Sequence, residues 1–73
     1  MNIIDLKHHM LITYAFSRYS VAAAICMAQG EVIVTDAMRR KAGRIIRDAK
    51  LNGLIKRLPQ YGSHYYAFTD KEG

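Results

Sequence analysis

The sequence predicts one small α+β domain over residues 1–73, mainly α-helical, with three helices followed by a C-terminal β-hairpin. Apolar residues recur at helical spacing over residues 3–17 and again over residues 36–52. After residue 53, two β-leaning segments flank a turn that contains proline and glycine. A hydrophobic content of 51% with 23% charged residues is typical of a folded domain rather than of a disordered chain.

The N-terminal half is expected to contain two short helices. The first spans about Ile3–Ser17 and carries Asp5 in its first turn, where a carboxylate suits the helix dipole. The segment Arg18–Ser20 is interpreted as a break whose serine caps the second helix. That helix covers about Val21–Gln29, is apolar on nearly every side, and stops at Gly30. We therefore expect it to be sandwiched in the core.

The third helix is predicted over Asp36–Asn52, with Thr35 or Asp36 as its cap and Gly53 at its end. Before it, the β-branched run at residues 31–34 indicates a strand or an extended turn. After it, residues 54–58 and 64–69 form the two arms of the predicted hairpin.

The hairpin arms are joined by the turn 59–63, and residues 70–73 form a polar tail. The aromatic residues of the predicted hairpin admit two interpretations. They are Tyr61, Tyr65, Tyr66 and Phe68. Strand alternation puts Tyr66 and Phe68 on one face, which favours a face that covers the core. The alternative is a platform on which single-stranded bases stack.

The positive charge is confined to one stretch of the chain. The whole chain has a net charge of +5, and residues 38–58 contain eight basic residues against Asp48, a net of +7. The basic residues are Arg39, Arg40, Lys41, Arg44, Arg47, Lys50, Lys56 and Arg57. Solvated helices usually alternate charges of opposite sign, and here only Arg44 and Asp48 offer such a pair. The excess therefore indicates a polyanionic partner rather than a plain solvated face.

On a helical wheel, the third helix separates into an apolar seam and a basic face. The seam comprises Met38, Ala42, Ile45, Ile46 and Ala49, and the opposite side carries Arg40, Arg44 and Arg47, flanked by Arg39 and Lys50. Gly43 lies within the basic face, although glycine in a helix interior costs about 1 kcal/mol relative to alanine. Either the helix backbone approaches something closely there, or the helix bends or breaks there.

Membrane, enzyme and metal classes find little support in the sequence. Arg18 interrupts the apolar stretch 10–28, which disfavours a membrane span or a secretory signal. One cysteine excludes an internal disulfide, and Cys26 is expected to be buried in a cytoplasmic protein. The adjacent His8 and His9 cannot face one ion on a helix, and no phosphate-binding glycine loop occurs. We expect a non-enzyme without cofactor or metal.

A basic amphipathic helix that ends in Asn52-Gly53-Leu54-Ile55-Lys56-Arg57, followed by a turn and an aromatic strand, resembles the winged helix-turn-helix proteins. The resemblance covers roughly residues 20–69. It implies a winged helix-turn-helix fold with Val21–Gln29 as the positioning helix, 30–35 as an enlarged turn and Asp36–Asn52 as the recognition helix. In an alternative register, residues 31–34 are the first strand of the sheet and short helices lie before and after Gly43.

The resemblance also implies a function: sequence-specific binding of double-stranded DNA by a small transcriptional regulator. It assigns Arg39, Arg40, Arg44 and Arg47 to the major groove, and Lys56, Arg57, Ser63 and His64 to phosphates or the minor groove. A homodimer or cooperative oligomer is expected on DNA, with Leu11 and Tyr14 as candidates for self-association, and RNA polymerase or another regulator as a further partner. The small size suggests a phage, plasmid or other mobile element. The alternative function is a protein-interaction module whose basic face docks an acidic protein.

Overall fold

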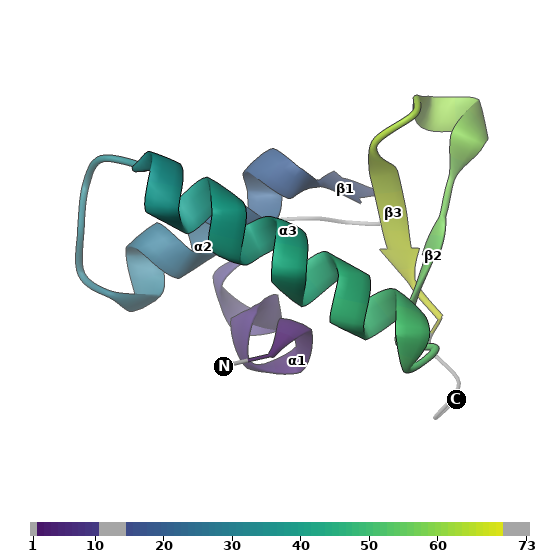
Figure 1. The fold of residues 1–73 in the computed structure, drawn as a ribbon, viewed down its shortest axis with the longest axis horizontal. Coiled ribbons are helices and arrows are strands. Elements are labelled where there is room, and N and C mark those ends of the chain that lie inside the picture. The colour runs from purple at the N-terminus through teal and green to yellow at the C-terminus, as the bar shows by residue number, and fades with distance from the viewer. Residues whose placement is uncertain (1, 11–14, 70–73) are drawn as a thin grey trace.

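Three α-helices and a three-stranded antiparallel sheet make up the fold (Figure 1), in a computed structural model that describes residues 2–10 and 15–69. The helices are α1 (Ile3–Leu6), α2 (Arg18–Ala28) and α3 (Asp36–Leu51), and the strands are β1 (Phe16–Ser17), β2 (Ile55–Arg57) and β3 (Tyr65–Phe68). Short 3-10 helical turns cover Lys7–His9 and Pro59–Tyr61. The predicted α+β class, with three helices and a C-terminal hairpin, is confirmed. The predicted tail at 70–73 lies outside the described residues.

The sheet has the order β1-β3-β2, so β3 is its central strand. Strands β2 and β3 form the predicted hairpin, with Ile55 opposite Phe68 and Arg57 opposite Tyr66. On the other side of β3, Phe16 lies opposite Tyr66 and Ser17 opposite Tyr65. The sequence did not predict this third strand, which ties the N-terminal part of the chain to its C-terminal hairpin.

The predicted first helix over residues 3–17 is wrong. Helix α1 ends at Leu6, and Phe16 belongs to a strand instead. Ile3 and Leu6 are buried, so the short helix already satisfies the apolar pattern at its start. Phe16 is 1% exposed and its ring centroid lies 5.1 Å from that of Phe68, because pairing with β3 holds it against the sheet. Leu11 and Tyr14, the candidates for self-association, lie outside the described residues.

Helix α2 begins three residues earlier than predicted, so the break expected at residues 18–20 is wrong. Ser17 is the N-cap, and the Ser20 hydroxyl accepts a hydrogen bond from the Ser17 backbone N–H at 3.3 Å from inside the helix. The helix ends at Ala28, and Cys26 is buried as expected. Met27, however, is 52% exposed, so α2 is not covered by core on every side.

The connection between α2 and α3 contains no strand. Val32 is 92% exposed and Ile33 is 71% exposed, whereas Val34 packs against the core. The alternative register, with residues 31–34 as the first sheet strand, is therefore wrong, and the register with two successive helices is confirmed. The Thr35 hydroxyl caps α3 by accepting a hydrogen bond from the Met38 backbone N–H at 3.2 Å.

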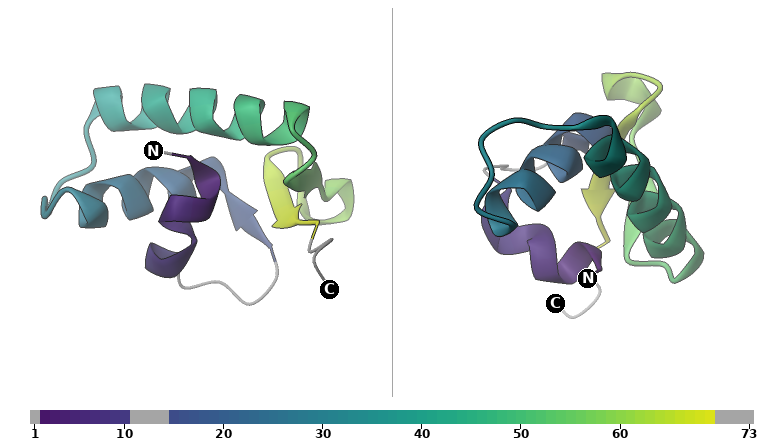
Figure 2. Two further views of the ribbon diagram at one scale, coloured as in Figure 1. Left: turned by 90° about the horizontal axis from the view of Figure 1, so that it is seen from below. Right: turned by 60° about the vertical axis from the view of Figure 1, so that its left-hand side comes forward.

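Helix α3 is continuous through Gly43, and its apolar seam lies in the core as predicted. All five seam residues are buried: Met38, Ala42, Ile45, Ile46 and Ala49. They pack with α1 and α2, whose buried residues include Ile3 and Ile25 (Figure 2). The same views place the α2–α3 connection at one end of the molecule and the hairpin at the other. Helix α3 therefore spans the distance between the two ends, with one side on the core.

Replacing Ile45 by aspartate should unfold the domain. Ile45 is 7% exposed, so Ile45→Asp removes a packed aliphatic group and buries an unpaired charge. The expected loss of about 4 kcal/mol or more is comparable to the whole stability of a domain of this size. Leu51→Asp is the matched control, because Leu51 lies on the same helix and is 79% exposed. Thermal melting followed by circular dichroism should lose its cooperative transition only in Ile45→Asp. A cooperative transition in that variant would contradict the packing of α3.

Candidate nucleic-acid interface

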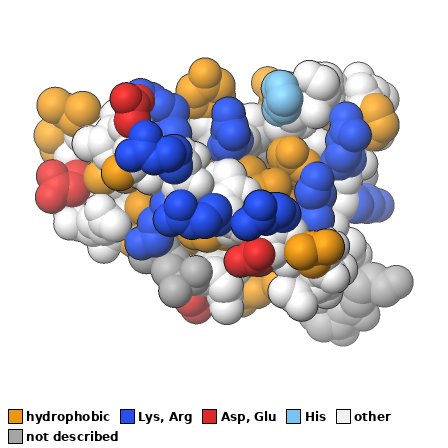
Figure 3. All heavy atoms as spheres, viewed as in Figure 1, with side chains coloured by type: hydrophobic (Ala, Val, Ile, Leu, Met, Phe, Trp, Pro, Cys, Tyr) orange, Lys and Arg blue, Asp and Glu red, His pale blue; other side chains and the backbone are white. Residues whose placement is uncertain are grey.

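Three arginines form the outer face of α3. Arg40, Arg44 and Arg47 are exposed, because they repeat at helical spacing on the side opposite the buried seam. In the view of Figure 3, Lys and Arg side chains form a band along α3 that continues onto the hairpin, with few acidic side chains between them. The helix has 16 residues and is therefore about 24 Å long. The outer face is thus an extended, exposed row of guanidinium groups.

The outer face has almost no internal charge compensation. Among residues 2–10 and 15–69, the one ion pair joins Arg39 to Asp36 at the start of α3. That hydrogen bond and the charge of Arg39 lower the pKa of the Asp36 carboxyl, which is therefore ionised at neutral pH. The pair between Arg44 and Asp48 that the sequence offered is not formed. The three outer arginines are left free to bind an external anion.

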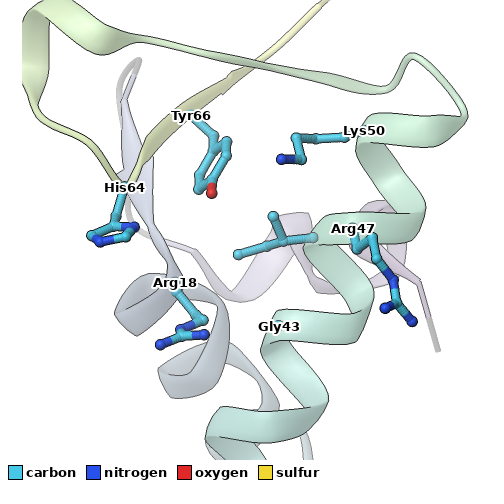
Figure 4. Close-up of a pocket in the computed structure, with 7 residues that line it drawn as sticks. Arg18, Gly43, Arg47, Lys50, His64 and Tyr66 are labelled. Atoms are coloured by element: carbon cyan, nitrogen blue, oxygen red, sulfur yellow. The ribbon is translucent and has the colours of Figure 1, made fainter.

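One flank of α3 is hollowed where it faces α2 and the hairpin. The hollow has a volume of about 250 Å³ and is lined by Arg18, Gly43, Ile46, Arg47, Lys50, His64 and Tyr66. In the close-up of Figure 4, the Lys50 ammonium and the Tyr66 hydroxyl point into the space, and Arg18 and His64 lie at its far side. The Arg47 guanidinium turns away from this space. Arg47 thus belongs with the outer face, and Lys50 with the hollow.

The Arg18 side chain lies beside Gly43 at a distance that leaves room for a Cβ atom. A Cβ atom on Gly43 would lie 3.5 Å from Nη1 and 3.8 Å from Cδ of Arg18, the first residue of α2. Gly43 is half-buried at this contact, on the flank of α3 rather than at the centre of the basic face. Both distances are ordinary van der Waals contacts, so alanine would also fit beside Arg18. The Arg18 side chain lines a second hollow together with Asp36, Arg39 and Arg40.

The hairpin carries the remaining predicted residues. Lys56, Arg57, Ser63 and His64 are all exposed, and Nη2 of Arg57 donates a hydrogen bond to the Ser63 carbonyl at 3.3 Å. The tip depends on Gly62, whose φ of +141° favours glycine. A Cβ at this position would lie 2.9 Å from the ring of Tyr65. The hairpin thus presents two basic side chains on β2 and an imidazole beside α3.

The aromatic residues of the hairpin divide as the core interpretation predicted. Tyr66 is 9% exposed and Phe68 packs against the core, whereas Tyr65 is 41% exposed. The Tyr66 ring also lies beneath the ammonium of Lys50, with 5.8 Å between Nζ and the ring centroid. The side chains of β3 that face inward are therefore structural, and they do not form an open stacking platform.

Sequence reasoning missed two residues of this site. Arg18 was assigned to a break between helices, and Tyr66 to the core or to a platform on which single-stranded bases stack. Arg18 lies beside Gly43 because α2 starts at that residue and packs against α3, and this arrangement depends on how the helices cross. The one local signal was the unexplained glycine on a basic helix face. It indicated a close contact without naming its partner.

Neither a metal centre nor a membrane-spanning helix is found among the described residues. No group of three or more His, Cys, Asp or Glu side chains gathers there in a way that would hold a metal ion. No helix in the same part of the chain has the length and apolarity to cross a bilayer. Comparison with known proteins gives no match to a family model, to a curated protein or to a solved structure.

Replacement by alanine should change the stability of the protein in opposite directions at Gly43, inside α3, and at Gly53, just after its end. Gly43→Ala should raise the free energy of unfolding by about 1 kcal/mol, because alanine favours the helix and its methyl group meets Arg18 only in van der Waals contact. Gly53→Ala should lower it by about 1 kcal/mol, because Gly53 has a φ of +72°. Thermal melting of both variants checks this. A lower melting temperature for Gly43→Ala would contradict the continuous helix.

Proposed function

We propose that this chain is a sequence-specific double-stranded DNA-binding protein of winged helix-turn-helix type, acting as a small transcriptional regulator. Helix α3 is the recognition helix and the β2–β3 hairpin is the wing. The observation that carries the proposal is the outer face of α3, where Arg40, Arg44 and Arg47 are exposed and form no ion pair among the described residues. Uncompensated positive charge on one helix face fits a polyanion.

The dimensions of α3 suit the major groove. A helix with its side chains is about 10–12 Å wide, and the major groove of B-DNA is about 12 Å wide. The seam opposite the arginines is buried against α1 and α2, so the helix can enter the groove without exposing its core contacts. Arginine is the commonest reader of guanine, because its fork of N–H groups matches O6 and N7. The outer face therefore carries the residue type that this recognition uses.

The order of the elements also supports the proposal. Helices α2 and α3 are consecutive and packed together, and α3 closes at Gly53 before the chain enters the hairpin at Ile55. This order is compatible with the succession of positioning helix, recognition helix and wing that the resemblance implied. Lys56, Arg57, Ser63 and His64 on the wing are proposed to contact phosphates or the adjacent minor groove.

Binding by more than one copy is part of the proposal. A single DNA-binding module buries only about 600–1,000 Å² on DNA, and paired half-sites are the usual way to gain specificity. A dimer or a cooperative array bound at a promoter would exclude RNA polymerase or offer it a contact, and either action regulates transcription.

The salt dependence of binding to a mixed-sequence duplex tests the proposed function. We expect the logarithm of the binding constant to fall linearly with the logarithm of the salt concentration, with a slope of several units, because each phosphate contact releases counterions. Fluorescence anisotropy with a labelled duplex gives this slope. An absence of duplex binding at about 50 mM salt would reject DNA as the ligand and favour the alternative, an acidic protein docked on the basic face.

Loss of single outer arginines should relax sequence preference. Once a preferred site has been selected from a random duplex library, Arg40→Ala or Arg44→Ala should weaken binding to it by about 1–3 kcal/mol and affect random duplex much less. Lys41→Ala is the matched control, because helical geometry places Lys41 away from the outer face, where it is half-buried. Equal weakening on all sequences would mean that these arginines contact only phosphate.

A further inference from the structure

The hollow between α2, α3 and the wing contains a polar group without a partner. Tyr66 is 9% exposed, and its hydroxyl forms no hydrogen bond within residues 2–10 and 15–69. No buried side-chain polar atom among the described residues lacks a partner, so this hydroxyl is open to solvent within the hollow. In Figure 4 this hydroxyl points into the hollow, toward the space between Lys50 and Arg18. The Tyr66 hydroxyl is therefore available to donate a hydrogen bond to a ligand that enters the hollow from solvent.

The residues around that hydroxyl share one electrostatic character. Arg18 comes from α2, Lys50 from α3 and His64 from the wing, so three elements distant in sequence bring nitrogen donors to one space. No carboxylate lines the hollow, and none of these three side chains forms an ion pair among the described residues. Two cationic side chains and an imidazole that converge without a counter-charge are suited to an anion with several acceptor oxygens.

We propose that this hollow is a phosphate-binding subsite that holds one phosphodiester of the DNA backbone, with Arg18, Lys50, His64 and the Tyr66 hydroxyl as its ligands. This inference rests on the proposed function. When a helix lies in the major groove, its flanks face the groove walls, which are the sugar–phosphate backbones. The hollow opens on such a flank, while Arg47 beside it turns toward the outer face.

The subsite would fix the position of α3 along the groove rather than read bases. Phosphate contacts set register and orientation without carrying sequence information. Gly43 forms part of the wall beside the Arg18 side chain.

Two variants test separately the contribution of the Arg18 charge and that of the Tyr66 hydroxyl to DNA binding. Arg18→Gln should raise the Kd for a duplex about tenfold or more and lower the salt slope by about 0.9, since one phosphate contact is lost. Tyr66→Phe keeps the ring beside Phe16 and should raise the Kd by about twofold to tenfold with an unchanged salt slope, because the hydroxyl is neutral. In both variants the ratio of specific to random binding should stay the same.

The matched controls lie outside the hollow. Tyr65→Phe removes the same hydroxyl from the neighbouring residue, which is 41% exposed and does not line the hollow. Lys41→Gln removes a positive charge from α3 away from this flank. Both should leave the Kd unchanged, and thermal melting should show that all four variants remain folded.

A set of duplexes with one neutral methylphosphonate each identifies the phosphate itself. At one backbone position the methylphosphonate should weaken DNA binding by the wild-type protein about tenfold. The same methylphosphonate should weaken binding by Arg18→Gln less, because this variant has already lost one of the contacts to that phosphate. A second titration, with inorganic phosphate and NMR observation of the Gly43 amide and the His64 ring, tests a free anion as the ligand.

The outcomes distinguish the two proposals. If the wild-type protein binds duplex and both variants bind equally well, the subsite is rejected while the proposed function stands. If the wild-type protein binds no duplex, both are rejected. Saturable shifts with inorganic phosphate would, in that case, assign the hollow to a free anion instead of DNA. Weakening by both variants, with the control variants unaffected, supports the subsite.

Discussion

Packing between α2 and α3 is the contact on which the other parts of the molecule depend. It is the most extensive contact between any two elements, and it is made in part by small side chains, with Ala22 on α2 and Ala42 and Ala49 on α3 buried. Close packing leaves little freedom for α3 to rotate about its own axis. The contact therefore decides which residues of α3 face solvent, and it keeps the arginines together on the outside.

The same contact divides the exposed part of α3 into two surfaces with different chemistry. The outer face carries Arg40, Arg44 and Arg47, whereas the flank near Gly43 is a hollow shared with Arg18 and the wing. Gathering this charge on one side is unfavourable for the isolated protein, since like charges repel. An anion that binds only the folded chain relieves that repulsion and adds its binding free energy to stability. Folding and ligand binding are therefore linked through α3.

Local signals account for the parts of the structure that the sequence predicted. The seam of α3, its cap at Thr35 and the turn of the hairpin are each encoded by residues close together in the chain. The first helix was mispredicted because Phe16 is governed by pairing with Tyr66, a contact with no local signature. Arg18 was missed for the same reason, since its contact with Gly43 arises from helix packing. The outer arginines were found because helical periodicity alone separates them from the seam.

The pairing of β1 with β3 has a consequence for the order in which the chain assembles. Phe16 and Ser17 have their partners at Tyr66 and Tyr65, about 50 residues further along the chain, so this edge of the sheet cannot close until Tyr66 has been synthesised. The α2–α3 pair and the hairpin join residues that are nearer in sequence, and such local contacts form faster than distant ones. Until β3 arrives, Phe16 lacks its two aromatic neighbours. The emerging chain thus carries a phenyl ring whose burial is completed only when β3 pairs with β1.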